Sequence, residues 1–403
     1  MTSRPWNPLP AAEAGTAPAA GTAPAAAAAR SRSALALALL AAFCDLAMFF
    51  PTLTRSHWLL RLALRELSLA IALVAALAWL LAHGLSDAPA RLARRVALPS
   101  LLAGVLPFVT PLPLFVRDRV PFSIVQYALS GLVTPRVRIE HDVVLDPAWP
   151  HLTADLYHAD GDGPHPFLVM AHGGSWRGGD KGEAPHFARR LAAAGFTVAD
   201  VRYRLAPEHP FPAAVADLKC LLGRLRERSR ELRLDPARAA LFGRSAGGQV
   251  ALVAAYSAGD PRIPPSCTVR DESVRAVIAM YAPIDLVYGY DHPMVPDVVH
   301  GNRALEGYLG GTPRSKPEAY RLGSPLGWLD RPVPPTLLIH GEGDRIVGRV
   351  HAERLRDALA ARGQSARVVT VPFGEHAFEA RAGGVGEQLA RHEIVRFLTA
   401  ALR

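Results

Sequence analysis

The feature that most constrains the fold is an alternation of short apolar runs with longer amphipathic stretches, which begins near residue 134 and continues to residue 403. Runs rich in β-branched and aromatic residues are typical of strands, and amphipathic stretches of about 10 to 15 residues between them are typical of helices. Apolar strands that alternate with helices predict an α/β domain, in which helices flank a mostly parallel, eight-stranded sheet. We expect strands over 136–145, 152–157, 166–174, 196–204, 239–245, 274–283, 335–344 and 366–373, and helices over 211–230, 246–257, 349–362 and 384–402.

One predicted strand–helix junction carries a serine bounded by glycines. Residues 242–249 read FGRSAGGQ, which places Gly243 and Gly247 around Ser245. A serine on so tight a turn has a strained backbone, and glycines at these positions remove side chains that would clash across the turn. The hydroxyl is then exposed above the sheet at a helix N-terminus, where negative charge is favoured. The stretch therefore predicts a nucleophilic serine, and the alternative is a glycine-rich turn with an incidental serine.

A serine hydroxyl is a poor nucleophile near neutral pH and needs a base, which in turn needs an orienting acid. Asp344 follows one predicted strand and His376 follows the last one, in the chain order serine, aspartate, histidine. Because chemistry collects at the carboxyl ends of parallel strands, we expect these side chains to meet Ser245 and form a catalytic triad. The other candidates are Glu342 and Glu375 for the acid and, less convincingly, His209 and His340 for the base.

A second glycine-rich stretch follows the third predicted strand, where residues 170–182 read MAHGGSWRGGDKG. The backbone N–H groups of Gly173 and Gly174, together with that of Ala246, are predicted to form an oxyanion hole. The rival interpretation is a phosphate-binding loop, but that loop would need Gly-Lys-Ser/Thr at the start of a helix, and the sequence has Lys-Gly. Trp176, beside the loop, is predicted to shape the substrate pocket.

The segment 284–325 lies between the sixth and seventh predicted strands and is polar, aromatic and rich in glycine and proline. We expect it to line or cover the acyl pocket, and the alternative is an ordinary surface excursion. The candidate wall residues are Tyr288, Tyr290 and Met294, of which Tyr288 is the strongest substrate-binding candidate.

Together these motifs resemble the α/β-hydrolase superfamily, specifically its hormone-sensitive-lipase-like esterase branch. The resemblance implies an α/β-hydrolase fold over 134–403 and hydrolysis of carboxylic esters through an acyl-enzyme on Ser245, with His376 as base, Asp344 as orienting acid and no cofactor or metal ion. The segments that carry it are HGGSW (172–176), YRLAPEHPFPAAVAD (203–217), GRSAGG (243–248), HGEGD (340–344) and GEHAF (374–378).

Two of the motifs are also similar to those of feruloyl-esterase-like, formamidase-like and isoprenylcysteine-methylesterase-like relatives. They are HGGSWRGGDK at 172–181 and YAPIDL at 281–286. The same triad can cleave amides, formamides or thioesters, so these activities stay open as alternatives. Some relatives are non-catalytic ligand receptors that have lost the catalytic histidine, which this chain retains at position 376.

Residues 30–133 differ in character from the rest of the chain. The apolar runs 33–50 and 67–82 approach the ~20 residues needed to cross ~30 Å of hydrocarbon, and arginines flank both. A third run, 96–116, contains four prolines and is interpreted as a kinked span or an interfacial segment. We predict an integral membrane region with two or three transmembrane helices, the alternative being buried helices of a soluble cap. The even spread of arginines predicts no orientation.

Composition adds three expectations. Residues 1–29 are rich in alanine, proline, glycine and threonine, which predicts a disordered tail. The net charge of +9 comes from arginine, and without a basic stripe interleaved with aromatic residues no nucleic-acid partner is expected. The three cysteines are far apart and odd in number, so no disulfide framework or metal site is predicted. The expected partners are therefore a small-molecule or lipid ester and the membrane.

Overall fold

The computed structural model describes residues 22–403. These residues divide into two compact units: one holds the chain up to Cys44 together with 70–103, and the other holds 45–69 and 104–403. Residues 45–69 and 104–133, which were predicted within the membrane region 30–133, are thus grouped with the α/β part of the chain. Of the predicted disordered tail, 22–29 form the first turns of a helix, and 1–21 lie outside the described residues.

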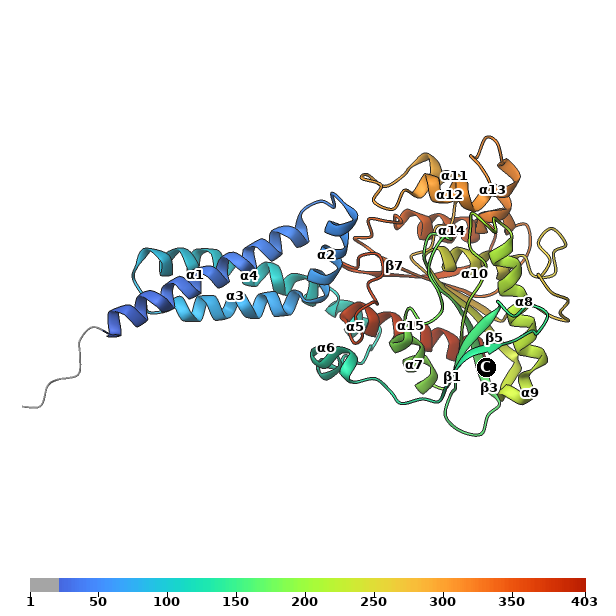
Figure 1. Ribbon diagram of the computed structural model, residues 1–403, viewed down its shortest axis with the longest axis horizontal. Helices are drawn as coiled ribbons and strands as arrows, with labels where there is room; N and C mark the ends of the chain where they lie inside the picture. Colours follow the sequence, from blue (N-terminus) through green and yellow to red (C-terminus); the bar gives the residue numbers. More distant parts are fainter. Residues whose placement is uncertain (1–21) are drawn as a thin grey trace, which may run out of the picture. The chain divides into compact units, whose positions relative to one another are not determined.

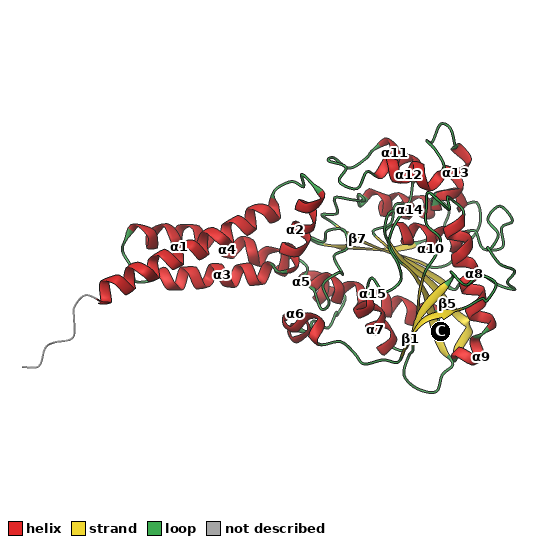
Figure 2. Ribbon diagram, in the orientation of Figure 1, coloured by secondary structure: helices red, strands yellow, loops and turns green. Residues whose placement is uncertain are grey.

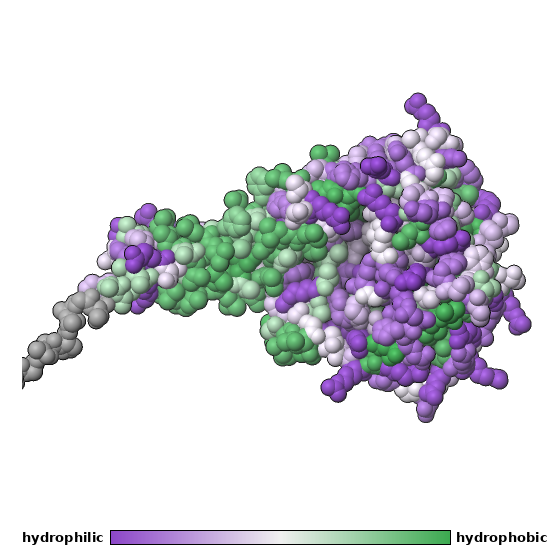
Figure 3. Space-filling view, viewed as in Figure 1, coloured by the Kyte–Doolittle hydropathy of each residue, from purple (hydrophilic) through white to green (hydrophobic). Residues whose placement is uncertain are grey.

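The first unit is built from parts of three helices, α1 (Thr22–Phe49), α3 (Ser68–Ala82) and α4 (Ala88–Val109). Small residues form its interior, as in membrane helix packing. Large apolar side chains lie on the outside instead: Phe43 is 65% exposed and Leu73 is 65% exposed. The visible face of these helices is hydrophobic along most of its length, with hydrophilic residues gathered at one end (Figure 3). The buried alanines are Ala34, Ala38, Ala78, Ala82, Ala90, Ala93 and Ala97.

Two stretches, Pro24–Phe49 and Ala88–Arg117, are long and apolar enough to cross a membrane. Helix α2 (Arg55–Glu66) and α3 together meet the same criteria as a pair, but they are bent by 71° at their junction. The prediction of two or three spans agrees with these lengths and compositions. An alanine interior with a leucine and phenylalanine exterior is the reverse of a water-soluble bundle, so it suits a lipid environment.

All eight predicted strands are present in the second unit, and they form one sheet in the order β1-β2-β4-β3-β5-β6-β7-β8. β1 and β4 pair antiparallel with β2, and every other neighbouring pair is parallel. The mostly parallel sheet expected from the alternating pattern is therefore confirmed. The strands are β1 (Ile139–Val144), β2 (Thr153–Tyr157), β3 (His165–Ala171), β4 (Thr197–Val201), β5 (Leu234–Arg244), β6 (Ala276–Met280), β7 (Thr336–Gly341) and β8 (Ala366–Val371).

Helices cover both faces of this sheet (Figures 1 and 2). Successive residues of a strand point to opposite faces, so the central strands feed two cores. Phe167 and Val169 of β3 join the core under α8, α10 and α14, whereas Leu168 and Met170 join the core under α7 and α15. The covering helices are α7 (Pro185–Ala193), α8 (Ala213–Glu227), α10 (Ala246–Tyr256), α14 (Val350–Ala360) and α15 (Val385–Ala401).

Shorter helices fill the connections. The segment between β6 and β7 contains α11, α12 and α13, so about half of the predicted 284–325 insertion is helical. The short elements are α5 (Leu112–Arg117), α6 (Ile124–Leu129), η1 (Ser130–Leu132), α9 (Ser229–Leu232), α11 (Leu286–Asp291), α12 (Gly301–Leu309), α13 (Pro317–Gly323) and η2 (Pro325–Trp328).

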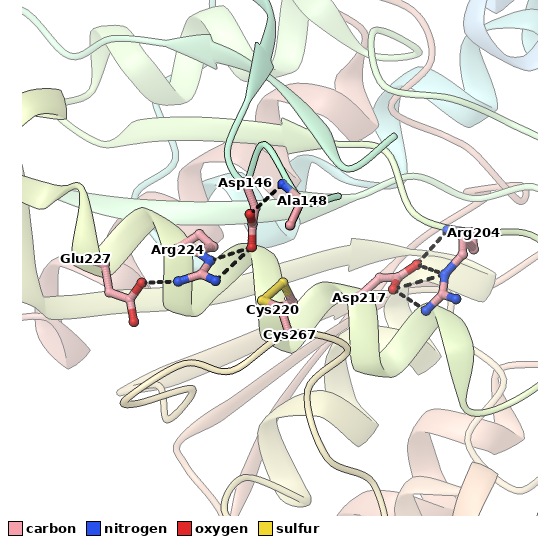
Figure 4. Close-up of a disulfide and its surroundings, with 8 residues drawn as sticks. All are labelled: Asp146, Ala148, Arg204, Asp217, Cys220, Arg224, Glu227 and Cys267. Atoms are coloured by element: carbon pink, nitrogen blue, oxygen red, sulfur yellow. Dashed lines mark hydrogen bonds and ion pairs between the residues drawn. A yellow bond between two sulfur atoms is a disulfide. The ribbon is translucent and has the colours of Figure 1, made fainter. Parts of the chain in front are cut away.

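The cysteine prediction was wrong for one pair. Cys220 of α8 forms a disulfide with Cys267, in the loop that precedes β6, with their Cα atoms 5.4 Å apart (Figure 4). Spacing along the chain hid this pairing, because the two residues are 47 positions apart and only the fold brings them together.

Figure 4 also shows an ion pair between Arg204 and the buried side chain of Asp217. Arg204 Nη2 lies 2.7 Å from Asp217 Oδ1.

Candidate active site

Ser245 stands at the tip of a sharp turn between β5 and α10. Its φ of 52° and ψ of −124° lie in a region that costs a non-glycine residue conformational energy. Two glycines make the turn possible. A Cβ on Gly243 would lie 2.1 Å from the carbonyl oxygen of Gly247, and a Cβ on Gly247 would lie 2.2 Å from that of His172. The glycine spacing around the serine is therefore a steric requirement of this turn.

The structure brings the three predicted triad residues into one hydrogen-bonded chain. His376 Nε2 lies 2.9 Å from Ser245 Oγ, and His376 Nδ1 lies 2.8 Å from Asp344 Oδ2. Ser245 follows β5, Asp344 follows β7 and His376 follows β8, so all three stand at the carboxyl ends of parallel strands. The separations match those of a nucleophile, a base and an orienting acid.

Asp344 has other partners in addition to His376. Its Oδ1 accepts hydrogen bonds from the backbone N–H groups of Ile346 and Val347, at 2.8 and 2.9 Å. His340 Nε2 lies 3.3 Å from Asp344 Oδ2. Burial acts to raise the pKa of Asp344, but His376 and His340 outweigh it and hold that pKa well below its usual value. The carboxylate is therefore ionised and fixed in orientation.

The alternative acids and bases have partners other than Ser245. Glu342 is exposed, and its Oε2 is 3.4 Å from the backbone nitrogen of Phe373. Glu375 is buried and pairs with two arginines of α2, and His209 is exposed. His340 contacts the acid rather than the serine, a supporting position that its place at the end of β7 could have indicated.

A further buried group beneath the histidine was not predicted. The ring of Tyr281 lies 4.5 Å from that of His376, and its hydroxyl donates to Glu379 Oε1. Arg244, beside the serine, lies 3.3 Å from the same carboxylate oxygen. Both Arg244 and Tyr281 belong to motifs that were read from the sequence, but neither motif indicates which partners they have.

The glycine-rich loop after β3 lies against the serine. A Cβ on Gly173 would lie 3.4 Å from Ser245 Cβ, so the loop backbone approaches the nucleophile closely. Gly174 has a φ of +115°, and a Cβ there would lie 2.0 Å from the Gly178 carbonyl oxygen. His172 stacks on Tyr203 with ring centroids 4.3 Å apart, and burial lowers its pKa to about 4. The loop is thus anchored by a neutral imidazole.

A cavity of about 150 Å³ opens beside Ser245. Trp176 lines it and is fixed by stacking on Tyr308, at a centroid distance of 4.6 Å, and by donating from Nε1 to Gln249 Oε1 at 2.7 Å. Other lining residues come from the segment 284–325, including Leu286, Tyr288, Met294 and Leu305. That segment therefore contributes a wall of this cavity.

Tyr290 is an exception among the predicted wall residues. It does not line this cavity. Its hydroxyl donates to Glu306 Oε1 at 2.6 Å, and its ring packs edge-on against Tyr320. Tyr288 and Tyr290 are two residues apart on the short helix α11, so they point in different directions, which the sequence pattern of this irregular segment did not resolve.

Comparisons with known proteins identify ester hydrolases among the relatives of this chain. The chain is 30% identical over 222 residues to "Probable carboxylic ester hydrolase LipM" of Mycobacterium tuberculosis, a match that covers 54% of this chain and 50% of that protein. Esterase LipQ of the same organism is 28% identical over 223 residues, covering 54% of this chain and 51% of that protein. The chain thus spans about half the length of these curated relatives.

A solved structure gives a similar result. The esterase of Pyrobaculum calidifontis is 27% identical, with a TM-score of 0.54, and the match covers 67% of this chain and 87% of that one. Residues 154–359 match the BD-FAE protein family, and they include both the serine turn and Asp344. With its eight-stranded sheet and serine turn, the chain belongs to the BD-FAE family of α/β-hydrolases.

Proposed function

We propose that this protein is a membrane-anchored serine carboxylesterase. The observation that carries the proposal is the continuous hydrogen-bonded path from Ser245 through His376 to Asp344. Relatives that are described as esterases support ester hydrolysis as the reaction.

In the proposed reaction, His376 Nε2 takes the proton of Ser245 Oγ as that oxygen attacks the ester carbonyl carbon. Asp344 stabilises the resulting imidazolium through Nδ1. Collapse of the tetrahedral intermediate breaks the bond to the alcohol, which leaves with the proton from His376. Water, deprotonated by the same imidazole, then attacks the acyl-enzyme and releases the acid.

The oxyanion of the intermediate is proposed to lie between the backbone N–H groups of Gly173, Gly174 and Ala246. The close approach of Gly173 to Ser245 supports this assignment, and Ala246 is the first residue of α10. A helix N-terminus carries a partial positive charge, so developing negative charge is stabilised there. Loss of one such donor typically costs about 10²- to 10³-fold in kcat.

The volume of the cavity beside Ser245 limits the length of the acyl chain that we propose for the substrate. A cavity of about 150 Å³ is known to hold a benzene molecule, so acyl chains up to about six carbons fit beside Trp176 and Tyr288. The enzyme should therefore prefer short esters, and a side chain that fills the cavity should discriminate by chain length.

Met294→Trp tests this size limit. We expect it to lower kcat/KM about 10- to 100-fold for p-nitrophenyl hexanoate but less than about threefold for the acetate. The indole ring would take the place of methylene groups of the longer acyl chain, and one methylene group in a hydrophobic pocket is worth about 1–3 kcal/mol. Steady-state kinetics of the detergent-solubilised full chain measure both, with an aryl formamide as the competing substrate class. Val295→Trp is the control, because Val295 is 87% exposed. Equal effects on both esters, or preferred turnover of the formamide, would contradict the proposal.

The apolar exterior of α1, α3 and α4 supports anchoring by transmembrane helices. We further propose that the α/β unit lies on the oxidising side of the membrane, because disulfides persist in oxidising compartments and are rare in the cytosol. The Cys220–Cys267 pair is the supporting observation.

Thiol counting in cells tests this topology. The chain has three cysteines, and acid-quenched, denatured protein should take up two more PEG-maleimides after reduction than before it, on Cys220 and Cys267. Uptake of three before reduction would show that the disulfide is absent in the cell and would remove the support for this placement.

A further inference from the structure

Helix α2 is amphipathic in the opposite sense to a helix on a water-soluble protein. Its outer face exposes Leu59, which is 50% exposed, and Leu60, which is 42% exposed. Its inner face carries Arg61, which is only 2% exposed, and Arg65, which is half-buried. Burying a guanidinium costs several kcal/mol unless it is paired, so the inner face must meet an acid.

That acid is Glu375, whose side chain is completely buried. Arg61 Nη2 lies 3.5 Å from Glu375 Oε2, and Arg65 Nη1 lies 3.4 Å from the same oxygen. Arg65 Nη1 also donates to the carbonyl oxygen of Phe373 at 2.9 Å. Two side chains of α2 therefore contact the loop that leads from β8 to the catalytic histidine.

Glu375 also reaches the loop of the catalytic acid. Its Oε1 accepts a hydrogen bond from the backbone N–H of Arg345 at 2.9 Å. Arg345 directly follows Asp344, and Glu375 directly precedes His376. One carboxylate thus ties the base loop to the acid loop, and α2 holds that carboxylate in place.

Two further contacts join α2 to the loops that carry His376 and Asp344. The ring of Trp58 lies 6.4 Å from the ring of His376. A Cβ on Gly343 would lie 2.3 Å from Arg65 Nη1, so the guanidinium packs directly on the backbone before Asp344. The inner face of α2 consequently contacts both loops that carry the triad.

We propose that Arg61 and Arg65 are positioning residues, which act through Glu375 to hold His376 in line between Asp344 and Ser245. The proposal rests on the esterase function proposed above. A buried ion pair adds little net stability, so we assign these two contacts to the geometry of the loop rather than to the stability of the fold. Burial raises the pKa of Glu375 while Arg65 and Arg61 act to lower it, consistent with a carboxylate that depends on these partners.

The test removes all three charges together in the full detergent-solubilised chain, as Arg61→Met, Arg65→Met and Glu375→Gln. No unpaired buried charge is left, so the fold should survive. Because misplacement of a catalytic group by about 1 Å can cost ~10²-fold, we expect kcat for a short p-nitrophenyl ester to fall about 10- to 100-fold. KM should change less than about threefold, since the substrate cavity lies apart from α2.

Two companion variants separate positioning from scaffolding. Arg61→Lys with Arg65→Lys keeps both positive charges, and since the original pairs are single long contacts, most of kcat should be retained. Arg55→Met changes an exposed arginine of the same helix and should leave kcat unchanged. If the triple variant does not fold, Arg65→Met alone, which leaves Arg61 paired with Glu375, is judged by the same criteria.

The proposal is overturned if the folded triple variant keeps kcat within about twofold of the parent. A loss expressed in KM rather than kcat, or one that the lysine pair shares, also overturns it. An inactive parent chain would instead remove the proposed esterase function, so the two failures are distinguishable.

Discussion

Ser245→Ala is expected to lower kcat for ester hydrolysis about 10⁴- to 10⁶-fold, the range found when the nucleophile of a triad is removed. The remaining oxyanion donors and the cavity should still bind substrate, so the loss should appear in kcat more than in KM. Steady-state hydrolysis of p-nitrophenyl butyrate by the detergent-solubilised chain measures it.

The matched control is Ser273→Ala, which changes an exposed serine far along the chain from the turn. It should behave like the parent. A Ser245→Ala protein with more than about a tenth of the parent kcat would mean that the acyl group is carried elsewhere or not at all.

Asp344→Asn is expected to lower kcat by about 10⁴-fold with little structural change. An asparagine can still accept through Oδ1 from the N–H groups of Ile346 and Val347, so its NH₂ would face His376 Nδ1. That contact forces the proton onto Nε2, and an Nε2 that carries a proton cannot accept the one from Ser245. The same assay measures this loss, and kcat should recover little at high pH because the tautomer, not the charge, is wrong.

Glu342→Gln provides the comparison, because Glu342 follows the same strand and was an alternative acid. It is exposed, and its Oε2 lies 3.4 Å from the backbone nitrogen of Phe373, so a change of less than about threefold is expected. A larger loss in Glu342→Gln than in Asp344→Asn would reassign the acid.

Much of this fold follows from local patterns in the sequence. The eight strands lie within or close to the predicted runs because each is a short apolar stretch that ends in a turn. The largest error in a strand boundary is that of β5, which begins at Leu234 and not at the predicted residue 239. The start was predicted too late because Asp235 and Pro236 are typical of a turn. Ser245, Asp344 and His376 could be predicted because a parallel sheet brings its strand ends together.

Contacts between distant segments could not be predicted in this way. Arg61 and Arg65 look like charges that flank an apolar run, and their partner Glu375 lies more than 300 positions later in the chain. Cys220 and Cys267 are 47 positions apart and are brought together by the packing of α8 against the loop before β6. Periodicity carries no information about such pairs, because it reports which face of an element is buried and not what covers that face.

Covalent labelling with a fluorophosphonate tests the central claim most directly, since this reagent modifies a serine only when a neighbouring base activates it. Intact-mass and peptide analysis of the full detergent-solubilised chain should show one adduct, on Ser245, and labelling should slow greatly in His376→Ala. A chain that takes up no adduct, or takes it up at another serine while Ser245 stays unmodified, would contradict the account.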